Sequence, residues 1–259
     1  MILRGPGVAG VSLALAAMAS LALTGCDTAS HDDRSETARA FPRADRPVSG
    51  LGSNAFSTES DRDDRNEAQI VMDMAGIEPG MSVADIGAGE GYYTVRLAER
   101  VGPRGRVLAQ DIDGDALRRL GARVEKDRLD NVSIKAGVAD DPRLPPASFD
   151  RIFMVHMYHE VAEPYAFLWR LWPALKPGGK LIVVDVDKST DRHGIPPALL
   201  TCELEAAGFR FDEFHRKPEL AGYFAQFVAA SSRPEPADIR PCRLKTAKGA
   251  GAAGAMKGN

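Results

Sequence analysis

The chain has 259 residues, of which 44% are hydrophobic and 27% charged, and its formal net charge is −3. This composition fits a soluble protein with one large α/β domain and tails, or two small domains. The absence of a basic excess argues against a general nucleic-acid binder, which must neutralise phosphates. Three cysteines are too few for a disulfide framework, no His/Cys cluster has zinc spacing, and we expect no metal site.

The first 25 residues are expected to be a signal peptide. Arg4 precedes an apolar run that starts at Val8 and is shorter than a comfortable membrane span of about 20 residues. The run ends in "LTGC", which resembles the lipobox of bacterial lipoproteins. That resemblance implies that Cys26 is lipidated, and Asp27 resembles the signal that retains such proteins at the inner membrane, on the periplasmic side. An uncleaved anchor or a misassigned start are the alternatives.

Two segments flanking the domain are expected to lack fixed structure. Residues 26–54 are rich in Asp, Arg, Ser and Pro, and are interpreted as a flexible tether. Residues 233–259 are rich in Pro, Gly, Ala and Lys, and are interpreted as a disordered tail. An oxidising compartment would permit a bridge between Cys202 and Cys242, but a flexible tail argues against it.

Residues 55–232 alternate between helical and strand-like patterns, as in a parallel sheet covered by helices on both faces. Two strand-like runs without a helix between them follow at the end and predict an antiparallel hairpin. In such sheets the ligand lies beyond the carboxyl ends of the strands, where the strand order reverses. The expected helices are 60–80, 91–102, 113–129, 163–176 and 196–208, and the expected strands are 81–87, 105–112, 131–137, 148–157, 178–187, 209–216 and 222–230.

The loop after the first strand, "VADIGAGEGYYT", is the strongest candidate for a ligand site. Glycines there let the backbone approach a ligand closely. Gly87, Gly89 and Gly91 are evenly spaced, whereas a dinucleotide fingerprint requires G-x-G-x-x-G, and Tyr92 occupies the place of its third glycine. No Gly-Lys-Ser/Thr follows, which excludes a P-loop.

This stretch resembles motif I of the class I S-adenosylmethionine-dependent methyltransferases. "LAQDI" with Asp111, "LKPGGKLIVVD" and "AAGF" before the final hairpin also resemble that family, over roughly residues 65 to 230. The resemblance is greatest to the quinone and type 11 groups. It implies a three-layer Rossmann-like fold with a mostly parallel seven-stranded sheet and S-adenosylmethionine as the cofactor.

The same resemblance implies roles for individual residues. Asp85 would order the loop and reach the methionine amino group, Asp111 would hold the ribose, and Ile112 would pack on the adenine. Relatives often have Gly-Asp after the third strand, but Val138 stands here, so Asp140, Asp141 or the backbone would make the adenine contact, and Asp140 is the first candidate. The expected cofactor-binding set is Asp85, Gly87, Ala88, Gly89, Gly91, Tyr92, Asp111, Ile112 and Asp140.

Candidate catalytic groups lie in "VHMYHEV", at the end of the fourth strand. A histidine is the natural base for an acceptor hydroxyl, because it titrates near neutral pH. His159, His156 and Tyr158 are the candidates, with structural hydrogen bonding as the alternative for each histidine. Methyl transfer to a small or lipid-soluble acceptor is the expected function. A catalytically silent cofactor-binding lipoprotein is the main alternative, because export would separate the domain from cytoplasmic cofactor, and a nucleotide-dependent oxidoreductase is the weaker one.

Overall fold

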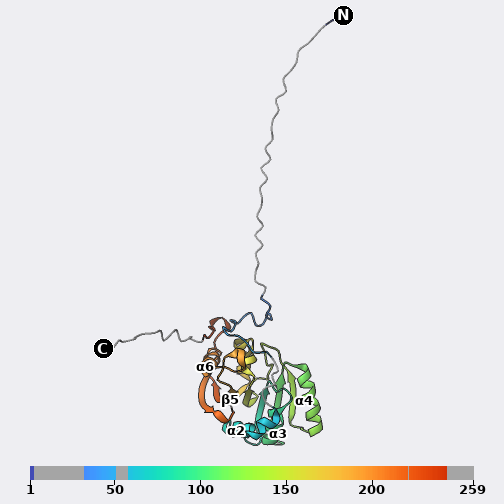
Figure 1. Cartoon of the computed structure of the whole chain (residues 1–259), viewed down its shortest axis with the longest axis vertical. Helices are drawn as coiled ribbons and strands as arrows, with labels where there is room; N and C mark the ends of the chain where they lie inside the picture. The colour runs from blue at the N-terminus through green and yellow to red at the C-terminus, as the bar shows by residue number, and fades with distance from the viewer. Residues whose placement is uncertain (3–31, 51–57, 221, 244–259) are drawn as a thin grey trace, which may run out of the picture. The chain divides into compact units, whose positions relative to one another are not determined.

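The computed structural model describes residues 1–2, 32–50, 58–220 and 222–243 (Figure 1). Cys26 and nearly all of the expected signal peptide lie outside the described residues. The elements of secondary structure all belong to the unit Arg34–Asn259. Among the described residues, no helix has both the length and the apolar character that crossing a membrane requires.

A seven-stranded sheet with the order β3-β2-β1-β4-β5-β7-β6 forms the centre of this unit. Strands β1 to β5 are parallel, and β7 pairs antiparallel with both β5 and β6. The predicted α/β fold and its terminal hairpin are therefore confirmed. The strand order reverses beside β1, where the glycine loop begins. The strands are β1 (Ser82–Ile86), β2 (Arg106–Asp111), β3 (Val132–Ala136), β4 (Phe149–Val155), β5 (Leu175–Asp185), β6 (Phe209–Lys217) and β7 (Gly222–Ala229).

Helices cover both faces of the sheet, and the first expected helix is divided in two. Asn66 adopts a left-handed conformation (φ 54°) between α1 and α2, which ends one helical direction and starts another. A short 3-10 turn containing Pro173 continues α5. The helices are α1 (Glu59–Asp64), α2 (Glu67–Met74), α3 (Tyr92–Val101), α4 (Gly114–Asp127), α5 (Pro164–Leu171) and α6 (Pro197–Ala206).

Strand β5 shows how the sheet is buried on both sides. Ile182 and Val184 pack with α2 and α3, whereas Leu181 and Val183 pack with α5 and α6. All four side chains are fully buried. Because side chains alternate along a strand, this continuous apolar run fills two separate cores.

The predicted tether is wrong for its described part, because that segment packs on the domain. Phe41 is buried with α5, and Arg46 forms an ion pair of 2.8 Å with Glu203 on α6, where the side chains are 3% and 0% exposed. A few anchoring side chains hold a segment whose average composition is polar.

The predicted tail is also wrong at its start. Ile239 is buried with α5, the backbone N–H of Cys242 donates to the Tyr165 hydroxyl (2.6 Å), and a disulfide joins Cys242 to Cys202 on α6. The bridge that the sequence disfavours is therefore present. Residues 244–259 lie outside the described residues.

Candidate functional site

The glycine loop follows β1 and turns by means of three left-handed residues. Gly87, Gly89 and Gly91 have φ of 68°, 55° and 90°, which only glycine adopts readily. Gly91 caps the start of α3, and the Ala88 N–H donates to the Gln110 carbonyl on β2 (3.0 Å). The loop is thereby fixed to the second strand.

The two sides of this loop differ in how closely they are packed. A Cβ atom at Gly87 would lie 2.9 Å from Cγ of Met157, whereas a Cβ at Gly89 would have no neighbour within 4 Å. Ala88 packs with Ala109 and Leu120 on the inner side. The backbone at Gly89 is therefore the part of the loop that a ligand can approach.

Asp111, at the end of β2, holds two loops with one carboxylate. Its Oδ2 accepts the Gly89 N–H (2.8 Å), and its Oδ1 accepts the Asp113 N–H (2.9 Å). A carboxylate oxygen has a second acceptor position, so both atoms can still accept hydroxyl groups. Ile112, next in the chain, is 40% exposed. Asp111 and Ile112 thus lie at the end of β2, where the resemblance predicts the ribose and the adenine.

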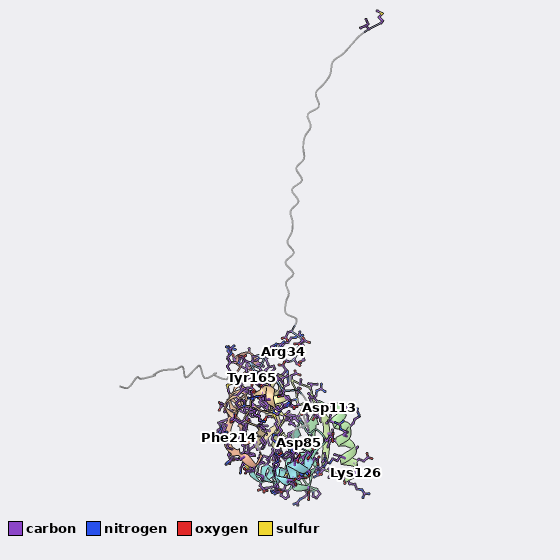
Figure 2. All side chains as sticks on the ribbon, viewed as in Figure 1. Arg34, Asp85, Asp113, Lys126, Tyr165 and Phe214 are labelled. Carbon is purple, nitrogen blue, oxygen red and sulfur yellow. A yellow bond between two sulfur atoms is a disulfide. The ribbon has the colours of Figure 1, made fainter. Side chains whose placement is uncertain are left out.

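Asp85, in β1 directly before the loop, is a buried carboxyl, and Figure 2 labels it within the domain. Its Oδ2 accepts a hydrogen bond of 2.6 Å from Thr94 on α3. Burial raises the pKa of Asp85 to about 6, and the Thr94 hydrogen bond and the charge of Arg62 only partly oppose this rise. At neutral pH Asp85 is therefore ionised, and its buried negative charge lowers the stability of the folded state.

We expect Asp85→Asn to stabilise the protein most above pH 6. In the folded state the pKa is raised from 3.8 to about 6, so the cost of ionisation is absent below pH 3.8, grows between these values and is complete above pH 6. A shift of this size corresponds to roughly 3 kcal/mol. Thermal unfolding of variant and wild type from pH 4 to 8 measures the difference, with Asp130→Asn on the surface as the control. A stability difference that does not grow with pH contradicts the expectation.

Tyr92, a member of the expected cofactor-binding set, packs between two arginines. Its ring lies between the guanidinium groups of Arg62 and Arg96, each 3.9 Å from the ring centroid, and its hydroxyl donates to Asp63 (3.0 Å). These contacts place the ring in the packing between α1 and α3. Tyr92 therefore has a structural role.

Asp140, the residue predicted to contact the adenine, has a carboxylate that holds the N-terminal segment. Its Oδ2 accepts hydrogen bonds from Thr37 (2.6 Å) and Ser35 (3.0 Å), and Arg170 lies 2.9 Å away. Burial opposes ionisation, but these partners together lower the pKa of Asp140. The connection from β3 to β4 contains no helix, and this contact anchors the N-terminal segment beside it.

His156 follows β4 directly and is fixed by a carboxylate from another element. It has φ of 55°, and its Nε2 lies 3.5 Å from Oε1 of Glu67 on α2. Burial disfavours the charge on Glu67, but His156 and Arg62 outweigh it and lower the pKa of Glu67 to about 2. The His156 side chain is 26% exposed, which makes it accessible to a ligand.

The other two catalytic candidates, Tyr158 and His159, are more deeply buried than His156. Tyr158 is fully buried and donates to Glu203 (2.7 Å), which gives it a packing contact with α6 and leaves its ring inaccessible to solvent. His159 lies in the 3-10 turn η2 (Tyr158–Glu160), and its Nδ1 is 2.9 Å from Oδ1 of Asp185 at the end of β5. Strand β4 ends at Val155, so His156 and Tyr158 do not lie on one face of a continuing strand.

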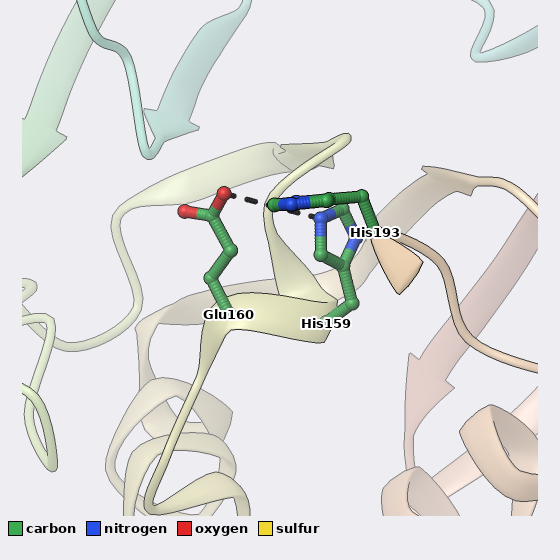
Figure 3. A group of neighbouring side chains, drawn as sticks. All are labelled: His159, Glu160 and His193. Carbon is green, nitrogen blue, oxygen red and sulfur yellow. Dashed lines mark ion pairs between the residues drawn. The ribbon is translucent and has the colours of Figure 1, made fainter. Parts of the chain in front are cut away.

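His159 also has two neighbours that bear potential ligand atoms (Figure 3). Its Nε2 is 3.9 Å from Oε1 of Glu160, and one atom each of His159, Glu160 and His193 lie within 4.8 Å of one another. His193 follows the 3-10 turn η4 (Thr190–Arg192) between β5 and α6. No sequence pattern predicts this group, because His193 is far from His159 and Glu160 along the chain.

Three partner residues were missed from the sequence: Glu67, Asp185 and His193. Glu67 belongs to α2, and nothing in the sequence of that helix indicates that the Glu67 side chain points into the protein. Asp185 had a usable signal, because it ends an apolar strand at the same edge as Asp111. Carboxylates in that position lie near the ligand in this class of sheet.

Comparisons with known proteins agree with this geometry. A family model described as "Methyltransferase domain" matches residues 77–208, half of the chain. A ubiquinone/menaquinone biosynthesis C-methyltransferase, UbiE, of Shewanella frigidimarina is 33% identical over 124 residues, covering 47% of this chain and 48% of that protein. The protein of the same name from Hydrogenovibrio crunogenus is 29% identical over 177 residues, covering 64% and 63%. The matched part of the chain thus spans between about half and just under two thirds of the length of these relatives.

Solved structures show the same fold. A SAM-dependent methyltransferase from Aquifex aeolicus is 28% identical, with a TM-score of 0.56, and the match covers 63% of this chain and 88% of that one. The [4+2]-cyclase SpnF has a TM-score of 0.58 over 76% of this chain and 92% of its own, but at 17% identity it shows the fold alone. With the matched family, the sheet order and the glycine loop in agreement, the chain belongs to the class I S-adenosylmethionine-dependent methyltransferases.

Proposed function

We propose that this protein transfers a methyl group from S-adenosylmethionine to a small aromatic hydroxyl compound of the quinol type. One observation carries the cofactor assignment: the Asp111 carboxylate accepts the Gly89 and Asp113 N–H groups at the point where the strand order reverses. The printed names of the curated relatives support a quinol-like acceptor.

The residues present fit the cofactor. A side chain at position 89 would fill the space beside the loop, Asp111 has acceptor positions for ribose hydroxyls, and Asp85 is an acidic group beneath the loop. When bound, S-adenosylmethionine supplies a methyl group on a positively charged sulfur. The chain then has to orient the acceptor and exclude water.

His156 is the group placed to take a proton from the acceptor. With Nε2–H directed at Glu67, its Nδ1 accepts the hydroxyl proton, and the Glu67 carboxylate stabilises the resulting imidazolium. His159 is only 4% exposed and less suited to this step. The left-handed backbone at His156 is a conformation that persists where the surroundings enforce it, as at functional sites.

We expect His156→Asn to lower kcat by roughly 100-fold, the range of general-base catalysis. Asparagine tolerates the left-handed backbone but does not titrate near neutral pH. The assay follows labelled methyl transfer from S-adenosylmethionine to a short-chain hydroquinone by the full chain, with calorimetry for cofactor binding. Cofactor affinity should stay within threefold, and His215→Asn on the exposed β6 should keep full activity. Cofactor binding without transfer to any acceptor tested would favour the silent binding protein instead.

We further propose that the protein is a lipoprotein anchored through Cys26 on the periplasmic side of the inner membrane. This location is supported by the lipobox resemblance of "LTGC" and by the Cys202–Cys242 disulfide, because disulfides persist in oxidising compartments. Running the same assay on membrane and soluble fractions tests it. Activity should remain with membranes in the wild type and move to the soluble fraction in Cys26→Ser. If the activity of wild type and of Cys26→Ser is distributed in the same way between the membrane and soluble fractions, Cys26 is not the anchor.

A further inference from the structure

We propose that His159, Glu160 and His193 bind a divalent transition-metal ion, for which Zn²⁺ is the representative. One ligand atom from each lies within 4.8 Å of the others. Two ligands at about 2.1 Å from zinc lie roughly 3.4 Å apart in a tetrahedral site. The three groups would therefore close by about 1 Å around an ion.

His159 is already oriented as a metal ligand. An ionised carboxylate only accepts hydrogen bonds, so the 2.9 Å contact with Asp185 places the ring proton on Nδ1. The Nε2 lone pair is then directed to the side where Glu160 lies, 3.9 Å away. Asp185 is fully buried and also accepts the Val186 N–H (2.7 Å), so it cannot turn away. Histidine ligands of metals characteristically have such a carboxylate behind them.

Ser49 fixes the two backbone turns that carry the histidines. Its N–H donates to the His159 carbonyl (3.4 Å), and its hydroxyl accepts the His193 N–H (3.1 Å) and donates to the Thr190 carbonyl. Ser49 is itself buried. The turns are thus held relative to each other, and only the half-buried side chains of Glu160 and His193 need to rotate to close the site.

The donor set selects the kind of ion. Two imidazole nitrogens and one carboxylate suit Zn²⁺ and neighbouring first-row ions, whereas Ca²⁺ and Mg²⁺ prefer all-oxygen sites. Three protein ligands leave an open position, as in zinc sites that bind water or substrate. Met157, two residues before His159, lies against Gly87, so the proposed site is at the same sheet edge as the glycine loop.

Calorimetric titration of the chelator-stripped, untagged full chain with Zn²⁺, disulfide intact and in detergent, tests the site. We expect one Zn²⁺ per chain, and at least tenfold weaker binding in His193→Ala and Glu160→Gln. Asp185→Asn keeps all three ligands but loses the orienting carboxylate, and it should weaken binding 10- to 100-fold. His215→Ala removes an exposed histidine that lies beside Glu213, and it should leave binding unchanged.

Circular dichroism and thermal unfolding establish that each variant is folded before it is titrated. His193 and Glu160 are the main test positions because they are more exposed than His159. Equal Zn²⁺ affinity in His193→Ala and wild type, or no binding by the folded wild type, would overturn the inference. The titration contains no S-adenosylmethionine and no acceptor. A failed methyl-transfer assay thus leaves the metal result intact, and the reverse also holds.

Discussion

Replacing Asp111 by alanine is expected to weaken S-adenosylmethionine binding by about 100-fold or more. The change removes the acceptors proposed for the ribose hydroxyls and also the partner of the Gly89 and Asp113 N–H groups. Hydrogen bonds to a charged group contribute roughly 1.5–3 kcal/mol each, and about 1.4 kcal/mol corresponds to tenfold in affinity. Two lost bonds to the ligand account for the expected factor, and the loosened loop adds to it.

Calorimetry with the full chain measures this effect, and Asp115→Ala is the matched control. Asp115 lies in the first turn of α4, close to Asp111 in the chain, but its carboxylate is exposed and contacts only Arg118 among the described residues. Its removal should change affinity by less than threefold. If Asp111→Ala also binds the cofactor within threefold of wild type, the nucleoside does not lie at the end of β2.

Replacing Arg46 by methionine is expected to lower the free energy of unfolding by about 3–5 kcal/mol. Arg46 and Glu203 form a buried ion pair of 2.8 Å, and Tyr158 donates to the same carboxylate. Removing only the cation leaves a buried negative charge, whose desolvation cost is then poorly offset. For a domain of this size the change corresponds to roughly 10 °C in Tm.

The double variant Arg46→Met, Glu203→Gln distinguishes the buried charge from loss of packing. Neutralising Glu203 removes the uncompensated charge, so the double variant should regain much of the stability that Arg46→Met loses. Arg43→Met removes an exposed arginine from the same segment and should cost little. Thermal unfolding by circular dichroism is the measurement. An unchanged Tm in Arg46→Met would mean that the segment does not pack on α6.

The fold was predictable from the sequence because its main signals are local. Strands such as β5 are apolar without interruption, which requires burial on both faces, and the glycines after β1 mark the ligand loop. Asp111 was predictable for the same reason, since it follows a recognisable strand at a defined edge. The two His–carboxylate pairs were only half predictable. Glu67 reaches His156 from a helix far back in the chain, and no local pattern encodes that contact.

The flanking segments show where averaging over composition fails. Their polar average predicts a tether and a tail, yet Phe41, Arg46 and Ile239 are enough to fix them against α5 and α6. Cys242 adds a covalent link to α6. A few widely spaced anchoring side chains can order a segment while its mean hydropathy stays polar. Such side chains are recognised as anchors only once the residues that they contact are known.

Two described segments that flank the domain, one at Arg46 and one at Cys242, contact α6, and this constrains the order in which the protein can mature. Glu203 receives its cation from a segment made before the sheet, and Cys202, one residue earlier, receives its sulfur partner from the last described segment. Helix α6 therefore reaches its final set of contacts only after residue 242 has left the ribosome. Until then the chain holds an unpaired thiol on that helix. Completion of the fold is thus a late event that depends on an oxidant.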